Sequence, residues 1–151
     1  REVITMMKTI NFDMDGTFVN LYGVENWLEY LINEDTTPYE IAKPLFNMSL
    51  FARLINKLQR EGWEIGIITW LSKNGTNDYN RKVAKAKREW LAKHLPSVEW
   101  DSIVILEYGT PKEIYCDYEG DILFDDEVNN RKNWNGIAFD VNDILGVLKN
   151  L

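Results

Sequence analysis

The sequence has one cysteine and one histidine, which is few for a chain of 151 residues. A single cysteine, Cys116, excludes an intrachain disulfide and a zinc cluster built from cysteines. The chain places no histidine close to Cys116, so we assign it no thiol chemistry. We interpret His94, the lone histidine, as marking the end of a helix rather than as a catalyst.

Long hydrophobic runs and a surplus of cations are also missing. No apolar stretch approaches the roughly 18 residues that a membrane span requires, and no charged-then-apolar leader is visible at the start. The chain carries 17 Lys and Arg against 24 Asp and Glu, a net charge of −7. This balance opposes broad coating of nucleic acid, which needs excess positive charge. We therefore expect a soluble cytoplasmic protein without membrane contacts.

The sequence has enough apolar material for one folded domain. Hydrophobic residues make up 45% and aromatic residues 13% of the chain, and about 150 residues is the usual size of a single domain. No repeat, linker or low-complexity tract divides it. We expect residues 1–7 to be an N-terminal extension, either added to the protein or belonging to an upstream start, and residues 8–151 to form the domain.

Short apolar runs alternate with longer amphipathic ones. The short runs predict strands, and the longer ones predict helices. Strands separated by helices favour an α/β fold with a parallel sheet covered on both faces. The expected strands are Thr9–Asp13, Glu64–Trp70, Ser102–Leu106, Asp121–Asp125 and Gly136–Asp140, and the expected helices are Val24–Leu31, Ser49–Arg60, Tyr79–His94 and Val141–Leu151.

Two carboxylates follow the first expected strand. Asp13 and Asp15 are two residues apart, so in extended chain they would face the same way, and Gly16 permits a turn after them. Crowded carboxylates separate in pKa, so that one can be a nucleophile while the other carries a proton. Asp13 would then attack phosphorus, and Asp15 would serve as general acid and base. An EF-hand calcium loop that begins at Asp13 is disfavoured, because its required glycine and glutamate positions hold Phe18 and Val24.

Other polar groups end later strands of the same predicted sheet. Thr69 ends one strand, and the pair Asp125 and Asp126 ends another. Chemistry in open parallel sheets gathers at the carboxyl ends of the strands. Alternative interpretations are an ordinary strand threonine and a pair of acids that cap the following helix.

The segment Asp13–Thr17 resembles the first motif of the haloacid dehalogenase (HAD) superfamily, whose members are mostly magnesium-dependent phosphatases. Thr69 matches the second motif, Lys112 the third, and the pair Asp125 and Asp126 the fourth. Lys73 competes with Lys112 as the motif lysine, and a solvated surface lysine is the alternative for either. The resemblance implies a three-layer Rossmann-like core with the first strand central.

The resemblance also implies the roles of the site residues. Thr69 would bind a phosphoryl oxygen, and the motif lysine would balance the charge on Asp13. Mg²⁺ would be held by Asp13, the backbone carbonyl of Asp15 and Asp125, with Asp126 in the next layer of contacts. We expect four further residues to contact substrate: Gly16, Thr17, Ser72 and Lys73.

Little chain is left over for a cap above the site. We expect a minimal cap insertion at about residues 33–47 and a rather open site. The phrase Thr69–Asn74 is similar to small HAD-like proteins of phages and bacteria and, more distantly, to 5′(3′)-deoxyribonucleotidases, which implies a (deoxy)nucleotide substrate. Aromatic residues near the site could stack a base, or could simply pack in the core; these are Phe18, Tyr22, Trp27 and Trp70.

Three functions remain open from the sequence. The first is a Mg²⁺-dependent phosphomonoester hydrolase that forms an aspartyl-phosphate. The second is a regulatory module that binds a nucleotide or phosphate with little turnover, and the third is a receiver-like signalling domain, disfavoured by Asp15–Thr17. The expected helix 79–94 is basic, and Arg81, Lys85 and Arg88 share one of its faces. We interpret this face as solvated, with the phosphate-rich end of a nucleic acid as the alternative partner.

Overall fold

A parallel five-stranded sheet lies at the centre of the computed structural model, which describes residues 8–151. The expected N-terminal extension, residues 1–7, lies outside the described residues. The strand order is β5-β4-β1-β6-β7, with β1 in the middle. The prediction of a parallel sheet with a central first strand is confirmed. The strands are β1 (Thr9–Phe12), β4 (Glu64–Trp70), β5 (Ser102–Leu106), β6 (Ile122–Phe124) and β7 (Ile137–Phe139).

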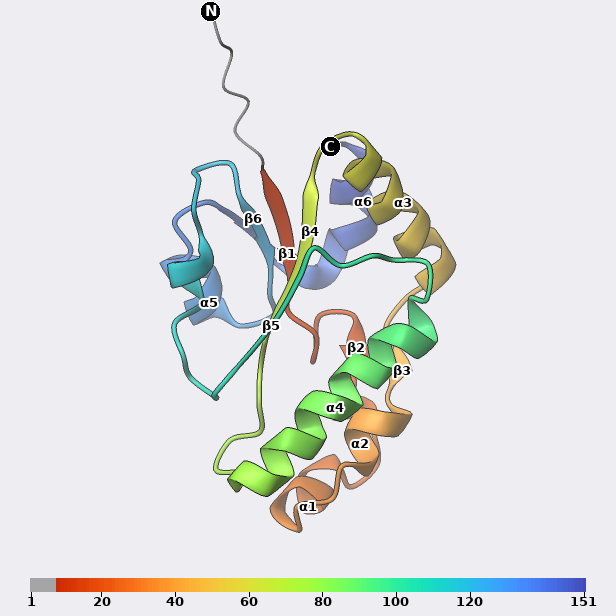
Figure 1. Cartoon of the computed structure of the whole chain (residues 1–151), viewed down its shortest axis with the longest axis vertical. Helices are drawn as coiled ribbons and strands as arrows, with labels where there is room; N and C mark the ends of the chain where they lie inside the picture. Colours follow the sequence, from red (N-terminus) through yellow and green to blue (C-terminus); the bar gives the residue numbers. More distant parts are fainter. Residues whose placement is uncertain (1–7) are drawn as a thin grey trace, which may run out of the picture.

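Helices flank the sheet on both faces (Figure 1). On one face lie α3 (Met48–Arg60) and α6 (Ile144–Lys149); on the other lie α5 (Val128–Asn133) and the short 3₁₀ helix η2 (Lys112–Tyr115). This is the predicted three-layer α/β architecture. Within residues 8–151, no helix combines the length and apolar character needed to cross a bilayer.

A third group of helices lies beyond the carboxyl ends of β1 and β4. It consists of α1 (Trp27–Ile32), α2 (Thr37–Ile41) and the N-terminal part of α4 (Asn77–His94). A two-stranded ribbon of β2 (Val19–Asn20) and β3 (Lys43–Pro44) ties the start of this segment to its end. The segment between β1 and α3 therefore folds as a small unit beyond the carboxyl ends of the central strands.

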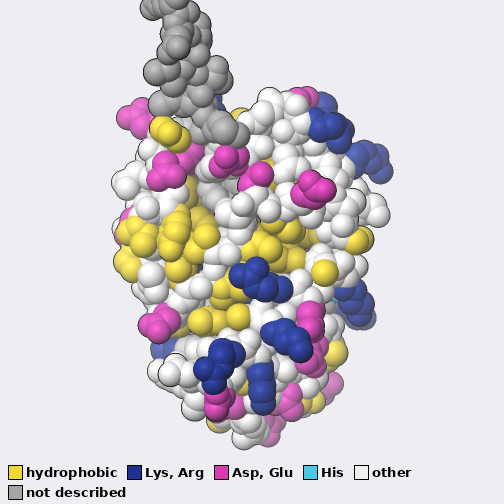
Figure 2. All heavy atoms as spheres, viewed as in Figure 1, with side chains coloured by type: hydrophobic (Ala, Val, Ile, Leu, Met, Phe, Trp, Pro, Cys, Tyr) yellow, Lys and Arg dark blue, Asp and Glu magenta, His cyan; other side chains and the backbone are white. Residues whose placement is uncertain are grey.

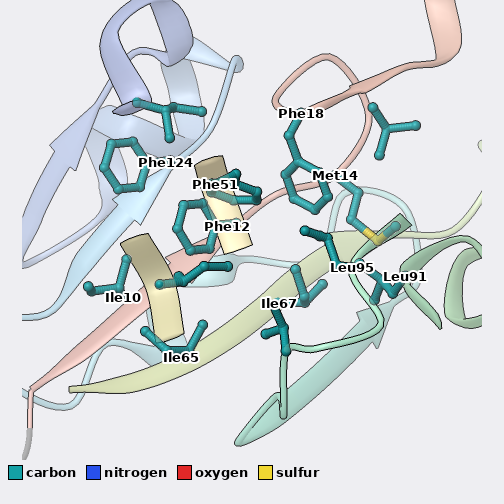
Figure 3. Packing of buried hydrophobic residues seen from close by; sticks show 14 of the residues in the cluster. Ile10, Phe12, Met14, Phe18, Phe51, Ile65, Ile67, Leu91, Leu95 and Phe124 are labelled. Carbon is teal, nitrogen blue, oxygen red and sulfur yellow. The ribbon is translucent and has the colours of Figure 1, made fainter. Parts of the chain in front are cut away.

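Aromatic rings fill the core between the sheet and α3 (Figure 3). Phe12 of β1 stacks on Phe124 of β6 with ring centroids 5.2 Å apart, and Phe51 of α3 meets Phe12 edge to face at 5.1 Å. Phe18 is fully buried, with its ring 5.3 Å from that of Phe51 and 5.7 Å from that of Trp90. Phe18 is thus a core residue, and the alternative that it stacks a base is wrong.

The first and last of the expected helices are shorter than the sequence predicts, for local reasons. The helix expected from Val24 begins at Trp27, because Leu21–Gly23 form a 3₁₀ turn and Asn26 adopts a left-handed backbone conformation with φ of 61°. The helix expected over 141–151 starts as a 3₁₀ turn and is regular only over Ile144–Lys149.

A polar residue in the central strand finds partners. Asn11 is 5% exposed, and its side-chain amide donates to Thr9 Oγ1 at 2.9 Å and to the carbonyl oxygen of Ile122 at 3.3 Å. Because a buried amide without partners is costly, these bonds explain how the strand tolerates an asparagine. They also link β1 to β6, the strand that precedes the second acidic pair.

Candidate active site

The acidic residues predicted at the ends of two strands lie together at the carboxyl end of the sheet. Asp13 follows β1, and Asp125 and Asp126 follow β6, its neighbour in the sheet. One carboxylate oxygen from each lies within 4.8 Å of the others. Neighbouring parallel strands end side by side, so residues more than 100 positions apart in sequence converge here.

Lys112 lies between two of these carboxylates. Its ammonium donates to Asp13 Oδ1 at 3.1 Å and to Asp125 Oδ2 at 2.7 Å, and the residue is 1% exposed. Burial alone would lower the pKa of Lys112, but the charges of Asp13 and Asp125 raise it above its usual value, so it stays protonated. The alternative of a solvated surface lysine is wrong for Lys112.

The competing lysine, Lys73, lies elsewhere in the same pocket. Its ammonium is 5.7 Å from the centre of the Tyr108 ring, and it contacts none of the acids above. Of the two lysines, Lys112 is the one beside Asp13. Lys73 instead sits at the mouth, where a positive charge can meet an incoming anion.

Asp13 is held by contacts on both of its oxygens. Lys112 binds Oδ1, and the hydroxyl of Thr17 donates to Oδ2 at 3.2 Å. Thr17 is 1% exposed and does not line the pocket. The structure therefore places Thr17 behind Asp13, as a support for the carboxylate, rather than facing substrate.

Gly16 makes room for the second acidic pair. Its φ is +79°, a conformation that side chains resist, and a Cβ built there would lie 2.3 Å from Asp126 Oδ2. Only glycine at this position lets the Asp126 carboxylate approach the turn after Asp13. Gly16 thus shapes the acidic cluster rather than offering a side chain to a ligand.

A network of hydrogen bonds orients Asp125, which is fully buried. Its Oδ2 accepts from Asn130 at 3.1 Å in addition to Lys112, and its Oδ1 accepts from the backbone N–H of Glu127 at 2.9 Å. The last bond forms a local turn ahead of α5. The N-cap of α5 is Glu127 and makes no side-chain cap hydrogen bond, so the alternative that one of the two acids caps this helix is wrong. The sequence analysis missed Asn130, which carries no distinctive pattern around it.

The acidic cluster contains more carboxyl groups than neighbouring positive charges. Burial, followed by the charge of Asp13, raises the pKa of Asp125 to about 6 against the opposing effect of Lys112. Burial and the same neighbour raise the pKa of Asp126 to about 8. Three crowded carboxylates with one adjacent ammonium are a donor set of hard oxygen ligands, which fits a divalent cation such as Mg²⁺.

Asp15 has a partner that the sequence analysis missed. Lys87 of α4 is 2% exposed, and its ammonium lies 2.8 Å from Asp15 Oδ2 and 2.7 Å from Thr69 Oγ1. Lys87 lies off the expected solvated face of Arg81, Lys85 and Arg88, and it is buried. A signal for its burial exists in the sequence: Lys87 lies four residues after Val83 and three before Trp90, on the apolar side of the helix.

The remaining basic residues of α4 do face solvent. Figure 2 shows Lys and Arg side chains gathered over this helix, and Lys85 pairs with Glu89 on its exposed surface. Arg81 pairs with Asp78 in the first turn. For these residues the interpretation as a solvated face is consistent with their exposure.

A pocket of about 580 Å³ opens beside the acids. One wall is polar and includes Asp13, Asp15, Thr69, Lys112 and Asp126, together with Ser72 and Lys73. The segment between β1 and α3 contributes Glu34 and Tyr39 to the lining, together with an apolar wall. This apolar wall consists of Leu21, Tyr22, Trp27, Leu28, Leu31 and Ile32. The pocket can therefore hold a charged group beside the acids and a flat apolar group against the apolar wall.

The fold and the four sets of matching residues define a class of enzyme: this chain is a phosphatase of the HAD superfamily, a phosphoric monoester hydrolase. The chain belongs to the family described as 5′ nucleotidase, deoxy (pyrimidine), cytosolic type C protein (NT5C), whose model matches residues 52–145. That match includes Thr69, Lys112 and Asp125 and begins after Asp13 and Asp15.

A solved structure shares the fold over nearly the whole chain. D,D-heptose 1,7-bisphosphate phosphatase from Burkholderia thailandensis superposes with a TM-score of 0.56 at 11% sequence identity, covering 95% of this chain and 97% of that one. At this identity the likeness concerns the fold. No curated protein matches the sequence significantly.

Proposed function

We propose that this protein is a Mg²⁺-dependent nucleotidase that hydrolyses a phosphomonoester through an aspartyl-phosphate on Asp13. The observation that carries the proposal is the position of Lys112, whose ammonium contacts both Asp13 and Asp125. This contact holds a carboxylate beside a cluster of acids suited to a cation, at the bottom of a pocket large enough for a small phosphate ester.

The chemistry divides into two displacements. In the first, an oxygen of Asp13 forms a bond to phosphorus while the bond to the ester oxygen breaks, and Asp15 gives its proton to that oxygen. In the second, Asp15 takes a proton from water as the water oxygen attacks phosphorus. The bond to Asp13 then breaks and inorganic phosphate leaves. Burial raises the pKa of Asp15, with the charge of Lys87 opposing it, and a raised pKa suits a carboxyl that must carry a proton.

The end of the pocket at the acids would hold both the metal and the phosphoryl group. Asp13, the backbone carbonyl of Asp15, and Asp125 would hold Mg²⁺, with Asp126 binding one of its water ligands. When bound, the ion neutralises charge on the phosphoryl oxygens and on the carboxylates around it. Thr69 and Ser72 would donate hydrogen bonds to phosphoryl oxygens, and Lys73 would attract the phosphate from the pocket mouth.

We propose a nucleotide as the substrate because of the family and the apolar wall of the pocket. The Tyr22 and Trp27 rings pack edge to face, 4.9 Å apart, and both line the pocket. Such rings offer a base a surface on which to stack. Both rings precede the cap insertion expected at about residues 33–47. We propose that it comprises residues 21–44, since most pocket-lining residues of this region precede Asn33.

A phosphate-release screen tests the proposal. Purified protein is incubated with nucleoside monophosphates, sugar phosphates and oligonucleotides that carry terminal phosphates, with Mg²⁺ or with chelator. We expect Mg²⁺-dependent release from a nucleoside monophosphate by the wild type and none by Asp13→Asn, with both proteins equally folded by circular dichroism. Tight nucleotide binding in a calorimetric titration without phosphate release would instead support a binding module.

A further inference from the structure

Lys87 uses every donor that its ammonium has. Its three N–H groups reach Asp15 Oδ2 at 2.8 Å, Thr69 Oγ1 at 2.7 Å and the backbone oxygen of Trp70 at 2.7 Å. The side chain is 2% exposed, and its ammonium is 5.6 Å from the centre of the Tyr39 ring. Lys87 therefore links the turn after β1, the end of β4 and the helix α4 at a point that water does not reach.

The contact with Asp15 distinguishes its two oxygens. An ammonium only donates hydrogen bonds, so Oδ2 must accept and cannot carry a proton that points at Lys87. Within residues 8–151, the only side-chain hydrogen bond at Asp15 is this one, and the carboxyl also lines the pocket. A proton on Asp15 therefore belongs on Oδ1, the oxygen left free for the substrate.

The contact with Thr69 fixes its hydroxyl in the same way. A hydroxyl has one proton to donate, and an oxygen that accepts from an ammonium keeps that proton for another partner. Thr69 is fully buried and lines the pocket beside Asp15. Its O–H is thereby directed to donate rather than accept, as a bond to a negatively charged phosphoryl oxygen requires.

We propose that Lys87 is a positioning residue for phosphoryl transfer, which holds Asp15 Oδ2 so that Oδ1 delivers the proton to the leaving oxygen and which turns the Thr69 hydroxyl toward the phosphoryl group. This inference rests on the proposed function, since it assigns Asp15 the role of general acid. Lys87 itself does not touch the substrate.

The test compares two esters of similar size that need the acid to different degrees. Benzyl phosphate releases a basic alkoxide, which resembles the 5′ oxygen of a nucleoside and must be protonated as it leaves. 4-Nitrophenyl phosphate releases a stable phenolate that leaves without a proton. The kcat/KM of each is measured for the wild type, for Lys87→Met and for Lys85→Met, a matched change at an exposed lysine of the same helix. The ratio of the two kcat/KM values is independent of how much of the preparation is folded.

Lys87→Met should lower kcat/KM for both esters, since Thr69 loses its orientation. The loss should be about 10–100-fold larger for benzyl phosphate, a part of the roughly 10²–10⁴-fold that a positioned general acid supplies. The excess loss should appear in kcat rather than in KM. Lys85→Met should leave both values and their ratio as in the wild type.

Losses of equal size for the two esters, including complete loss of both, would overturn the inference and leave Lys87 as a structural brace. Failure of the proposed function has a different outcome. In that case the wild type would release no phosphate from either ester in the presence of Mg²⁺.

Discussion

Removing the ammonium of Lys112 should destabilise the protein and do so in a pH-dependent way. Lys112→Met keeps the length of the side chain but leaves Asp13 and Asp125, now 3.1 and 2.7 Å from the ammonium, without their shared cation. Breaking one partner of a buried ion pair costs about 3–5 kcal/mol. For a domain of this size each kcal/mol lowers Tm by about 2–4 °C, so the loss should be roughly 6–20 °C without metal.

The loss should depend on the ionisation of the acids. The pKa of Asp125 is raised to about 6 even beside Lys112, and without the ammonium it rises further. The variant can therefore relieve its uncompensated charge by binding a proton, so the difference from wild type should be largest above pH 7 and should shrink below pH 6.

Thermal unfolding in chelator at pH 5 and pH 8, followed by circular dichroism, measures this difference. Lys73→Met is the matched control, because Lys73 lines the same pocket without contacting the acids. It should shift Tm by little at either pH. If Lys112→Met were no less stable than Lys73→Met at pH 8, the reasoning about the ion pair would be refuted.

Three further changes probe the acidic cluster and its support. Gly16→Ala places a methyl group where Asp126 Oδ2 lies, 2.3 Å from the ideal Cβ, and should weaken Mg²⁺ binding in a calorimetric titration; unchanged affinity would contradict the role of that close approach. Burial and the charge of Asp13 raise the pKa of Asp126 to about 8. The protonated carboxyl therefore contributes its full stabilisation to the metal-free protein below pH 4, and this stabilisation is lost by about pH 8. Asp126→Asn should abolish this pH-dependent loss in unfolding curves, and an unaltered pH profile would contradict the assignment. Asp121 accepts backbone hydrogen bonds from Thr9, Asp117 and Tyr118. Asp121→Ala should therefore lower the free energy of unfolding by about 1.5–3 kcal/mol in denaturant without changing Mg²⁺ affinity. A large change in Mg²⁺ affinity would instead place Asp121 in the metal site.

Sequence reasoning predicts the sheet well because its signals are local. The apolar runs around Ile10, Ile67 and Leu123 each become a buried parallel strand, and the connection lengths leave room for helices between them. Polar residues at strand ends then converge by topology alone, which is why the sequence by itself predicts that Asp13 and Asp125 lie together.

The rest depends on packing that no short window of sequence reveals. Lys87 is one of several lysines in a basic helix, and only its place between Val83 and Trp90 separates it from Lys85, which faces solvent. Thr17 follows Gly16 in the first motif, but its hydroxyl turns back to Asp13 because the chain bends there.

The sequence names Phe18, Tyr22, Trp27 and Trp70 as aromatic residues near the site, and the last three do line the pocket. Trp27 lines it as the first residue of α1, directly after Asn26 in its left-handed conformation. Whether an aromatic side chain lines a pocket or fills a core depends on such turns, as the burial of Phe18 shows.

A crystal structure with Mg²⁺ and beryllofluoride, a mimic of a phosphoryl group, tests the central claim most directly. The account predicts beryllium bonded to a carboxylate oxygen of Asp13, with the magnesium ion contacting Asp13, Asp125 and the backbone oxygen of Asp15. A magnesium ion bound away from these residues, or beryllofluoride attached to another side chain, would contradict it.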